Sequence, residues 1–185
     1  MRKLGKSFFN KSAITVAKSL LGCFVVRKIG GKVIRGKIVE TEAYEGIGDR
    51  ASHACRGRTK RNEPMFGESA RAYIYLIYGM YYCFNIVTGP IDHPAAVLIR
   101  AVEVNGKDSR IASGPGKFCR AFLIDKRLNL LDLSQSKSLL IFERKKPLGA
   151  KEITAVPRIG VDYAGPWRYK KWRFYIKDNP AVSKK

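Results

Sequence analysis

Residues 38–44 place two carboxylates and a phenol where acid–base chemistry can occur. If this segment is an extended strand, the alternation of side chains sets Glu40, Glu42 and Tyr44 on one face. A carboxylate beside an aromatic ring suits a general base at the edge of a pocket that stacks a flat substrate. Carboxylates that alternate along a strand also occur on solvated faces, and that is the simpler interpretation of this segment on its own.

Residues 73–85 hold a high density of tyrosine around Gly79. On a hairpin with a glycine at its tip, such rings can stack on nucleic-acid bases and insert between stacked bases. A tyrosine-rich core hairpin or a protein interface accounts for the pattern equally well. The tyrosines are Tyr73, Tyr75, Tyr78, Tyr81 and Tyr82.

His53 lies among polar and basic residues in the segment 51–62. This setting predicts a loop close to where phosphates would run. A metal site formed by His53 and Cys55 lacks a second pair of ligands, and the H-x-E and C-x-x-C elements of zinc deaminases are absent. A simple surface histidine is the alternative.

Two further stretches resemble known anion or nucleophile motifs. Residues 113–117 resemble a phosphate-cradling loop, because backbone N–H groups at the start of a helix bind anions. The loop is not a Walker A motif, since the glycine spacing differs and Phe118 stands where Ser or Thr is required. Residues 134–137 match the S-x-x-K pattern of penicillin-binding enzymes without its companion motifs, which indicates a chance match.

The elements that must position these side chains are marked by glycine and by hydrophobic spacing. Ser12 as N-cap, apolar residues at helical spacing and Gly22 as the stop predict a helix over residues 13–21. Gly30-Gly31 predicts a two-residue hairpin turn. The predicted strands span residues 23–28, 32–44, 72–78, 82–87, 95–102, 138–143 and 173–177, and a short helix spans 118–122. This order predicts an α+β fold in a single domain over residues 1–185, a mostly antiparallel sheet with a few flanking helices and a protruding hairpin.

The register of the tyrosine hairpin stays open between two turns. A two-residue Gly79-Met80 turn pairs Tyr75 with Phe84. A three-residue loop through Tyr81 pairs Tyr75 with Asn85 instead, and only this register sets those two residues opposite each other.

The charge of the chain points to a polyanion as partner. Its 36 Lys and Arg against 15 Asp and Glu give a net charge of +21, spread along the sequence. Such a field attracts nucleic acid or an anionic membrane, although a solubilising surface is an alternative. No apolar signal segment follows Met1, and residues 74–84 are too short and too rich in tyrosine to span a membrane. We therefore expect an intracellular protein of the cytoplasm or nucleoid, or of the nucleus if the source is eukaryotic. Four scattered cysteines favour reduced thiols over disulfides or zinc.

Together these stretches resemble the alkyladenine (3-methyladenine or methylpurine) DNA glycosylase family. The resemblance keeps the family's order over nearly the whole chain. One departure is the short linker between Val104 and Ser113, where many relatives carry a longer insertion. The matching runs are residues 20–22, 39–44, 52–53, 61–62, 65–66, 75–85, 97–101, 113–115 with 117, and 158–161.

The resemblance implies a role for each matching residue. Glu42 corresponds to the general base, and Arg100 and the carbonyl of Ile159 correspond to groups that hold the attacking water. The base pocket corresponds to Tyr44, His53 and Tyr75, with Asn85 meeting the 2-amino group of guanine, and Tyr78 corresponds to the side chain that fills the vacated space in the duplex. Expected contacts with the DNA backbone are Arg58, Met80, Tyr81, Ser113 and Lys117.

The activity implied by this resemblance is base excision from duplex DNA. The enzyme flips out an alkylated or deaminated purine (3-methyladenine, 7-methylguanine, hypoxanthine or ethenoadenine) and hydrolyses its N-glycosidic bond, as a monomer without metal or cofactor. Because no lysine is among the matched pocket residues, water is the expected nucleophile and no strand cleavage is expected. The competing hypothesis is a non-catalytic module that binds single-stranded nucleic acid. A metal-dependent nuclease or deaminase lacks a ligand set.

Overall fold

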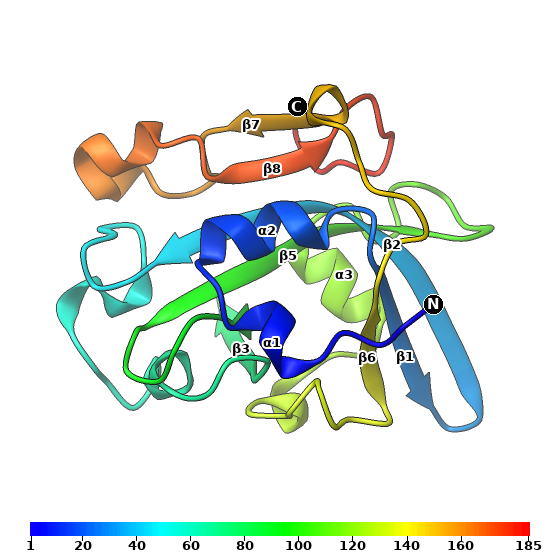
Figure 1. The fold of residues 1–185 in the computed structure, drawn as a ribbon, viewed down its shortest axis with the longest axis horizontal. Coiled ribbons are helices and arrows are strands. Elements are labelled where there is room, and N and C mark those ends of the chain that lie inside the picture. The colour runs from blue at the N-terminus through cyan, green and yellow to red at the C-terminus, as the bar shows by residue number, and fades with distance from the viewer.

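A computed structural model describes residues 1–185, and its centre is one antiparallel sheet (Figure 1). The strands follow the order β3-β4-β5-β2-β1-β6, with β8 paired to β2 and β7 paired to β8. The strands are β1 (Phe24–Ile29), β2 (Lys32–Glu45), β3 (Ala72–Ile77), β4 (Tyr81–Val87), β5 (Ala95–Val104), β6 (Leu139–Phe142), β7 (Ile153–Val156) and β8 (Arg173–Ile176). All paired strands are antiparallel, which confirms the predicted α+β class.

Three α-helices accompany the sheet, and five 3-10 segments lie in the connections. The helices are α1 (Lys6–Phe9), α2 (Ala13–Leu20) and α3 (Pro115–Ala121), and the 3-10 segments are His53–Arg56, Glu63–Phe66, Lys126–Leu128, Ala150–Glu152 and Asp162–Tyr169. Sequence reasoning missed α1, β7 and the 3-10 segments. These are short elements that depend on tertiary contacts more than on a local pattern.

Helix α2 forms where its capping residue and apolar spacing predict. The Ser12 hydroxyl accepts a hydrogen bond from the backbone N–H of Thr15 at 3.2 Å, which satisfies one free donor of the first turn. The buried face packs on β2 and β5, and the Thr41 hydroxyl ties it to the sheet by donating to the carbonyl of Ala17 at 2.9 Å. Gly22, with φ of +80°, follows the helix end.

Strand β2 is the central strand, and both of its edges are occupied where the two glutamates lie. Its first half pairs with β1 across the predicted Gly30-Gly31 turn, in which both glycines have positive φ. Its second half pairs with β8 at Glu40–Glu42, while β5 pairs along the other edge with a register shift around Val39. Glu40 and Glu42 are consequently both fully buried. The solvated-face interpretation of this segment is therefore wrong.

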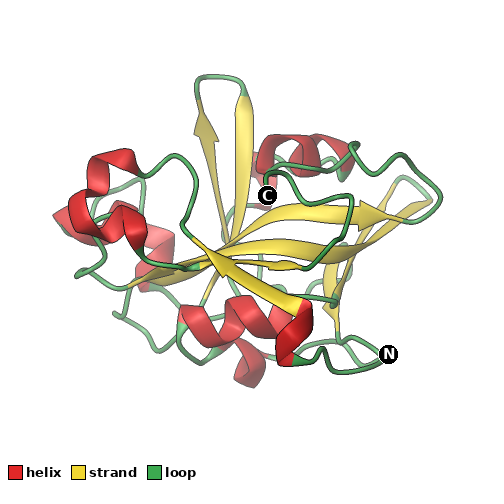
Figure 2. Ribbon diagram, turned by 90° about the horizontal axis from the view of Figure 1, so that it is seen from above, coloured by secondary structure: helices red, strands yellow, loops and turns green.

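The β3–β4 hairpin projects from the rest of the chain in Figure 2, but neither predicted register is correct. Ile77 pairs with Tyr81 and Tyr75 pairs with Cys83, so the loop is Tyr78-Gly79-Met80. Tyr78 and Gly79 take the positive φ values of the turn (51° and 69°), and Met80 N–H donates to the carbonyl of Ile77 at 3.1 Å. The turn thus lies one residue earlier than glycine placement alone predicts.

Candidate active site

A cavity of about 530 Å3 lies between the β3–β4 hairpin and the end of β2. Its size is in the range of small-molecule sites and accommodates a purine. The structure brings together around it most of the residues that the resemblance assigned to catalysis and base binding. Tyr44, His53, Tyr75, Asn85, Arg100, Ile159 and Tyr78 line it, together with Tyr73 and Cys83.

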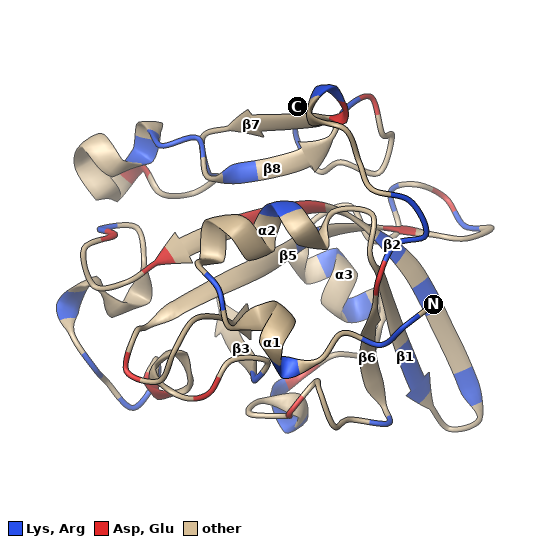
Figure 3. Cartoon of the chain, viewed as in Figure 1, with Lys and Arg blue, Asp and Glu red and all other residues tan.

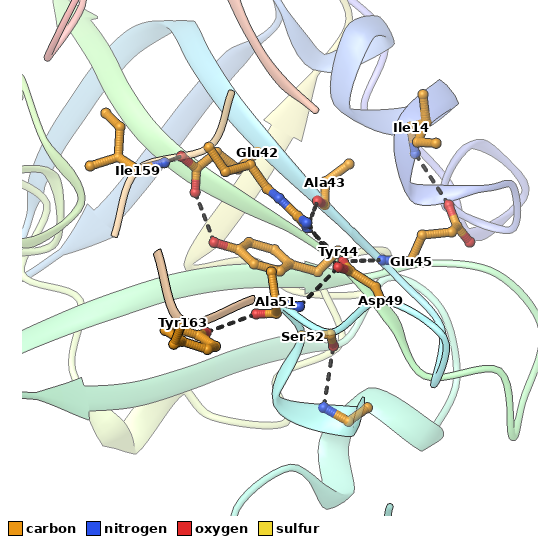
Figure 4. A network of polar contacts seen from close by, with 12 residues as sticks. Ile14, Glu42, Ala43, Tyr44, Glu45, Asp49, Ala51, Ser52, Ile159 and Tyr163 are labelled. Atoms are coloured by element: carbon orange, nitrogen blue, oxygen red, sulfur yellow. Dashed lines mark hydrogen bonds and ion pairs between the residues drawn. The ribbon is translucent and has the colours of Figure 1, made fainter. Parts of the chain in front are cut away.

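Glu42 lies directly behind this wall, buried and held by two hydrogen bonds (Figure 4) and one ion pair. Its Oε2 accepts a hydrogen bond from the Tyr44 hydroxyl at 2.8 Å, and its Oε1 accepts from the Ile159 backbone N–H at 2.8 Å. Arg100 Nη1 lies 3.4 Å from Oε1. The carboxylate therefore has one fixed orientation, next to the wall of the cavity.

Arg100 lies between two buried carboxylates. Its Nε is 3.5 Å from Oε1 of Glu40, while its Nη1 faces Glu42. Burial lowers the pKa of the guanidinium, but Glu42 and Glu40 raise it more, so the net pKa lies above its usual value and the group stays charged. Glu40 is further held by Arg173 Nη1 at 2.7 Å and by the backbone N–H of Ser183 at 2.8 Å.

Three rings form one side of the cavity. His53 and Tyr75 meet edge to face with centroids 4.6 Å apart, and Tyr73 lies 5.2 Å from Tyr75. His53 Nδ1 and the Tyr73 hydroxyl are 2.9 Å apart. Loss of solvent around the imidazole, followed by the charge of Arg61, lowers the pKa of His53, so the ring is neutral at neutral pH. Burial raises the pKa of Tyr73 to about 12, which keeps its hydroxyl protonated.

Asn85 faces the same cavity with its amide fixed. The side chain is 2% exposed, and its Nδ2 donates to the carbonyl of Tyr73 at 3.1 Å. The observed register pairs Asn85 with Tyr73, not with Tyr75. Tyr75 and Asn85 still share the cavity, because alternate residues of paired strands point to one face. Tyr73, Tyr75, Cys83 and Asn85 form that face.

Comparison with known proteins identifies the family to which these residues belong. The family model described as "Methylpurine-DNA glycosylase (MPG)" matches residues 7–180. The chain belongs to the methylpurine-DNA glycosylase family. A protein of Methanocella arvoryzae is 45% identical over 198 residues, covering 100% of this chain and 98% of the relative. One of Legionella pneumophila (strain Corby) is 47% identical over 184 residues, covering 100% of both. Both carry the name "Putative 3-methyladenine DNA glycosylase". The chain is accordingly a DNA glycosylase.

The side chains expected to contact DNA differ in their exposure to solvent and in their contacts within the protein. At the tip of the glycosylase hairpin, Tyr78, Met80 and Tyr81 are 86%, 64% and 46% exposed. Lys117 is exposed on α3 and Ser113 is half-buried in the preceding loop. Arg58 is exposed but engaged within the protein, since its Nη2 contacts Asp92 at 2.6 Å.

Sequence reasoning missed several residues that shape the glycosylase site. Tyr73 could have been found, since it alternates with Tyr75 along the same strand. Asp49 gave no signal, and Arg158 lay in a matching run without a role. The backbone group of Ile159 that contacts Glu42 is the N–H, whereas the resemblance assigned a role to the carbonyl.

The structure adds four observations that bear on membranes, cysteines, metals and charge. No helix is long and apolar enough to cross a membrane. All four cysteines are free, and no cluster of three His, Cys, Asp or Glu side chains is placed to hold a metal ion. Lys and Arg lie on helices, strands and loops throughout the glycosylase and are not confined to its ends (Figure 3).

Proposed function

We propose that this glycosylase flips alkylated or deaminated purines out of duplex DNA and hydrolyses their N-glycosidic bonds with water activated by Glu42. The observation that carries the proposal is a buried, oriented carboxylate joined through the Tyr44 hydroxyl to a cavity lined by rings. A general base needs this position, because the sugar carbon of a nucleotide whose base fills the cavity comes to rest at its wall.

Base extrusion is the first step, because an enzyme cannot reach the glycosidic bond of a stacked base. Extrusion costs on the order of a few kcal/mol, and less at a damaged or mismatched pair. The exposed ring of Tyr78 at the hairpin tip offsets part of that cost by filling the space that the base leaves. The base then stacks among Tyr44, His53 and Tyr75.

Hydrolysis then follows, in which one proton moves from water to the carboxylate and one electron pair leaves with the base. Water bound between Arg100 and Glu42 gives its proton to the carboxylate while its oxygen bonds to the sugar C1′. The C1′–N bond breaks and its electron pair leaves with the purine. A base alkylated at N3 or N7 is cationic, so it stacks more strongly on tyrosine and leaves as a neutral molecule. Hypoxanthine and ethenoadenine need a proton in addition.

The absence of lysine from the lining of the cavity supports water as the nucleophile. The products are then a free base and an abasic site in an uncleaved strand. We further propose that the enzyme acts as a monomer, inside the cell, and without a metal or cofactor.

Incubation with a duplex that contains hypoxanthine tests the proposal. The expected products are free hypoxanthine and a strand that breaks only after alkali treatment, with no complex trapped by borohydride. A complex trapped by borohydride would show that the nucleophile is an amine of the protein and not water. Tight binding of single strands without any base release would favour a non-catalytic binding module instead.

Asn85→Ser is expected to increase the removal of guanine-derived bases. The amide is buried and tied to the carbonyl of Tyr73, so it cannot move aside for a 2-amino group. A smaller hydroxyl leaves room, and steric discrimination of this kind is worth about tenfold or more. The measurement is the ratio of 7-methylguanine to hypoxanthine excision in single-turnover assays. An unchanged ratio would show that Asn85 does not discriminate against bases with a 2-amino group.

A further inference from the structure

A fully buried ion pair lies behind Tyr44, outside the cavity. Arg158 Nη1 lies 2.5 Å from Oδ2 of Asp49, and Nη2 donates to Oδ1 at 2.8 Å. Both side chains are 0% exposed, and neither lines the cavity. A buried ion pair contributes little net stability compared with well-packed apolar residues, because both charges lose their hydration. Its position relative to the site is therefore the more informative feature.

Arg158 fixes one side of the site to β2. Its Nη1 also donates to the carbonyl of Ala43 at 2.8 Å, next to Glu42 in the chain. Its guanidinium lies 4.8 Å from the centroid of the Tyr44 ring, close enough for a cation–π contact. The same side chain thus touches the strand that carries Glu42 and the ring whose hydroxyl donates to Glu42.

Asp49 holds Arg158 in place and shapes the loop that leads to His53. Its carboxylate accepts hydrogen bonds from the backbone N–H groups of Glu45 at 3.2 Å and Ala51 at 3.1 Å (Figure 4). All four polar contacts of this carboxylate are therefore made, two of them to Arg158. Asp49 cannot shift without breaking several bonds at once, which makes it a rigid anchor.

The residue after Arg158 supplies the second donor to Glu42. The Ile159 backbone N–H reaches Oε1 at 2.8 Å, and the residue directly before it, Arg158, is bonded to the Ala43 carbonyl of β2. We propose that Arg158, held by Asp49, is a positioning residue for Glu42. It orients the two donors, the Ile159 N–H and the Tyr44 hydroxyl, that aim the carboxylate. This inference rests on the proposed role of Glu42 as the base.

Arg158→Lys tests the proposal, since lysine keeps the charge but loses the two-pronged geometry. Single-turnover excision from a 7-methylguanine duplex is expected to fall about a hundredfold, as for a small misplacement of a reacting group. Binding of the lesion duplex is expected to stay almost unchanged, because Glu42 acts in the transition state. Each variant is assayed at a temperature where circular dichroism shows it folded. Arg27→Lys is the matched control, because Arg27 is also buried and bonded to backbone carbonyls but lies on β1.

A double-mutant cycle separates positioning from a general structural role. In a Glu42→Gln background, Arg158→Lys is expected to cause little further loss, since residues that act as a unit are not additive. A full additional hundredfold loss in that background would overturn the proposal, as would a wild-type rate for Arg158→Lys alone. Asp49→Glu, which keeps the charge but lengthens the side chain, is expected to repeat the result if Arg158→Lys does not fold. Failure of the wild-type protein to release any base would instead refute the proposed function.

Discussion

Replacing Glu42 with Gln is expected to slow excision by about two to four orders of magnitude while leaving the binding of lesion-containing duplex almost unchanged. The amide has nearly the shape of the carboxylate and remains within the buried site, but it cannot take a proton from water. A general base contributes about 10²–10⁴-fold to rate, so the single-turnover rate is expected to fall by that factor. The dissociation constant, measured by fluorescence anisotropy on a hypoxanthine duplex, is expected to stay the same, because the base acts in the transition state.

The matched control for this substitution is Glu143→Gln. Glu143 is part of an exposed ion pair with Arg2, so its replacement removes the same charge far from the cavity. Wild-type activity is expected there. A Glu42→Gln variant that excises at near the wild-type rate would show that another group activates the water.

Binding of duplex DNA is expected to weaken steeply with salt. If about six phosphates are contacted, log K falls against log salt with a slope of about −5, which is about a thousandfold between 50 and 200 mM. The physical reason is release of counterions, driven here by a net charge of +21. Titrations of an undamaged duplex at several salt concentrations measure the slope directly. A flat response would indicate that the charge serves another purpose.

The contribution of a single lysine to that salt dependence can be measured with alanine variants. Replacing Lys117, which is exposed on α3, with Ala is expected to reduce the magnitude of the slope by about one. Lys28→Ala removes another exposed charge, from the β1–β2 hairpin, and is expected to leave the slope unchanged. Equal effects of the two variants would show that the charge acts as a diffuse field without a defined phosphate contact.

Elements defined by local chemistry were predictable from the sequence. Helix α2 and the β1–β2 hairpin depend on Ser12, apolar spacing and Gly30-Gly31, and the structure confirms both. The β3–β4 register was not predictable in this way, because its turn places Tyr78 in a conformation that local preferences assign to glycine. The sequence locates that hairpin correctly but not its pairing.

The environment of the site depends on contacts that no local pattern encodes. Burial of Glu42 requires β8, more than a hundred residues further along the chain, and the charge of Arg100. Alternation alone favours a solvated strand for the same residues. The pairing of Asp49 with Arg158 is equally long in range, so neither residue stands out until the chain is folded.

The backbone of Tyr78 has a consequence for how the hairpin tip can evolve. A non-glycine residue with φ of +51° bears strain of about 1–2 kcal/mol, which glycine at that position would relieve. A large ring that is 86% exposed to water also gains nothing from burial in the free protein. If Tyr78 fills the duplex as proposed, selection for thermal robustness and selection for the insertion step favour different residues at this tip, and a tyrosine there serves DNA binding at the expense of heat resistance.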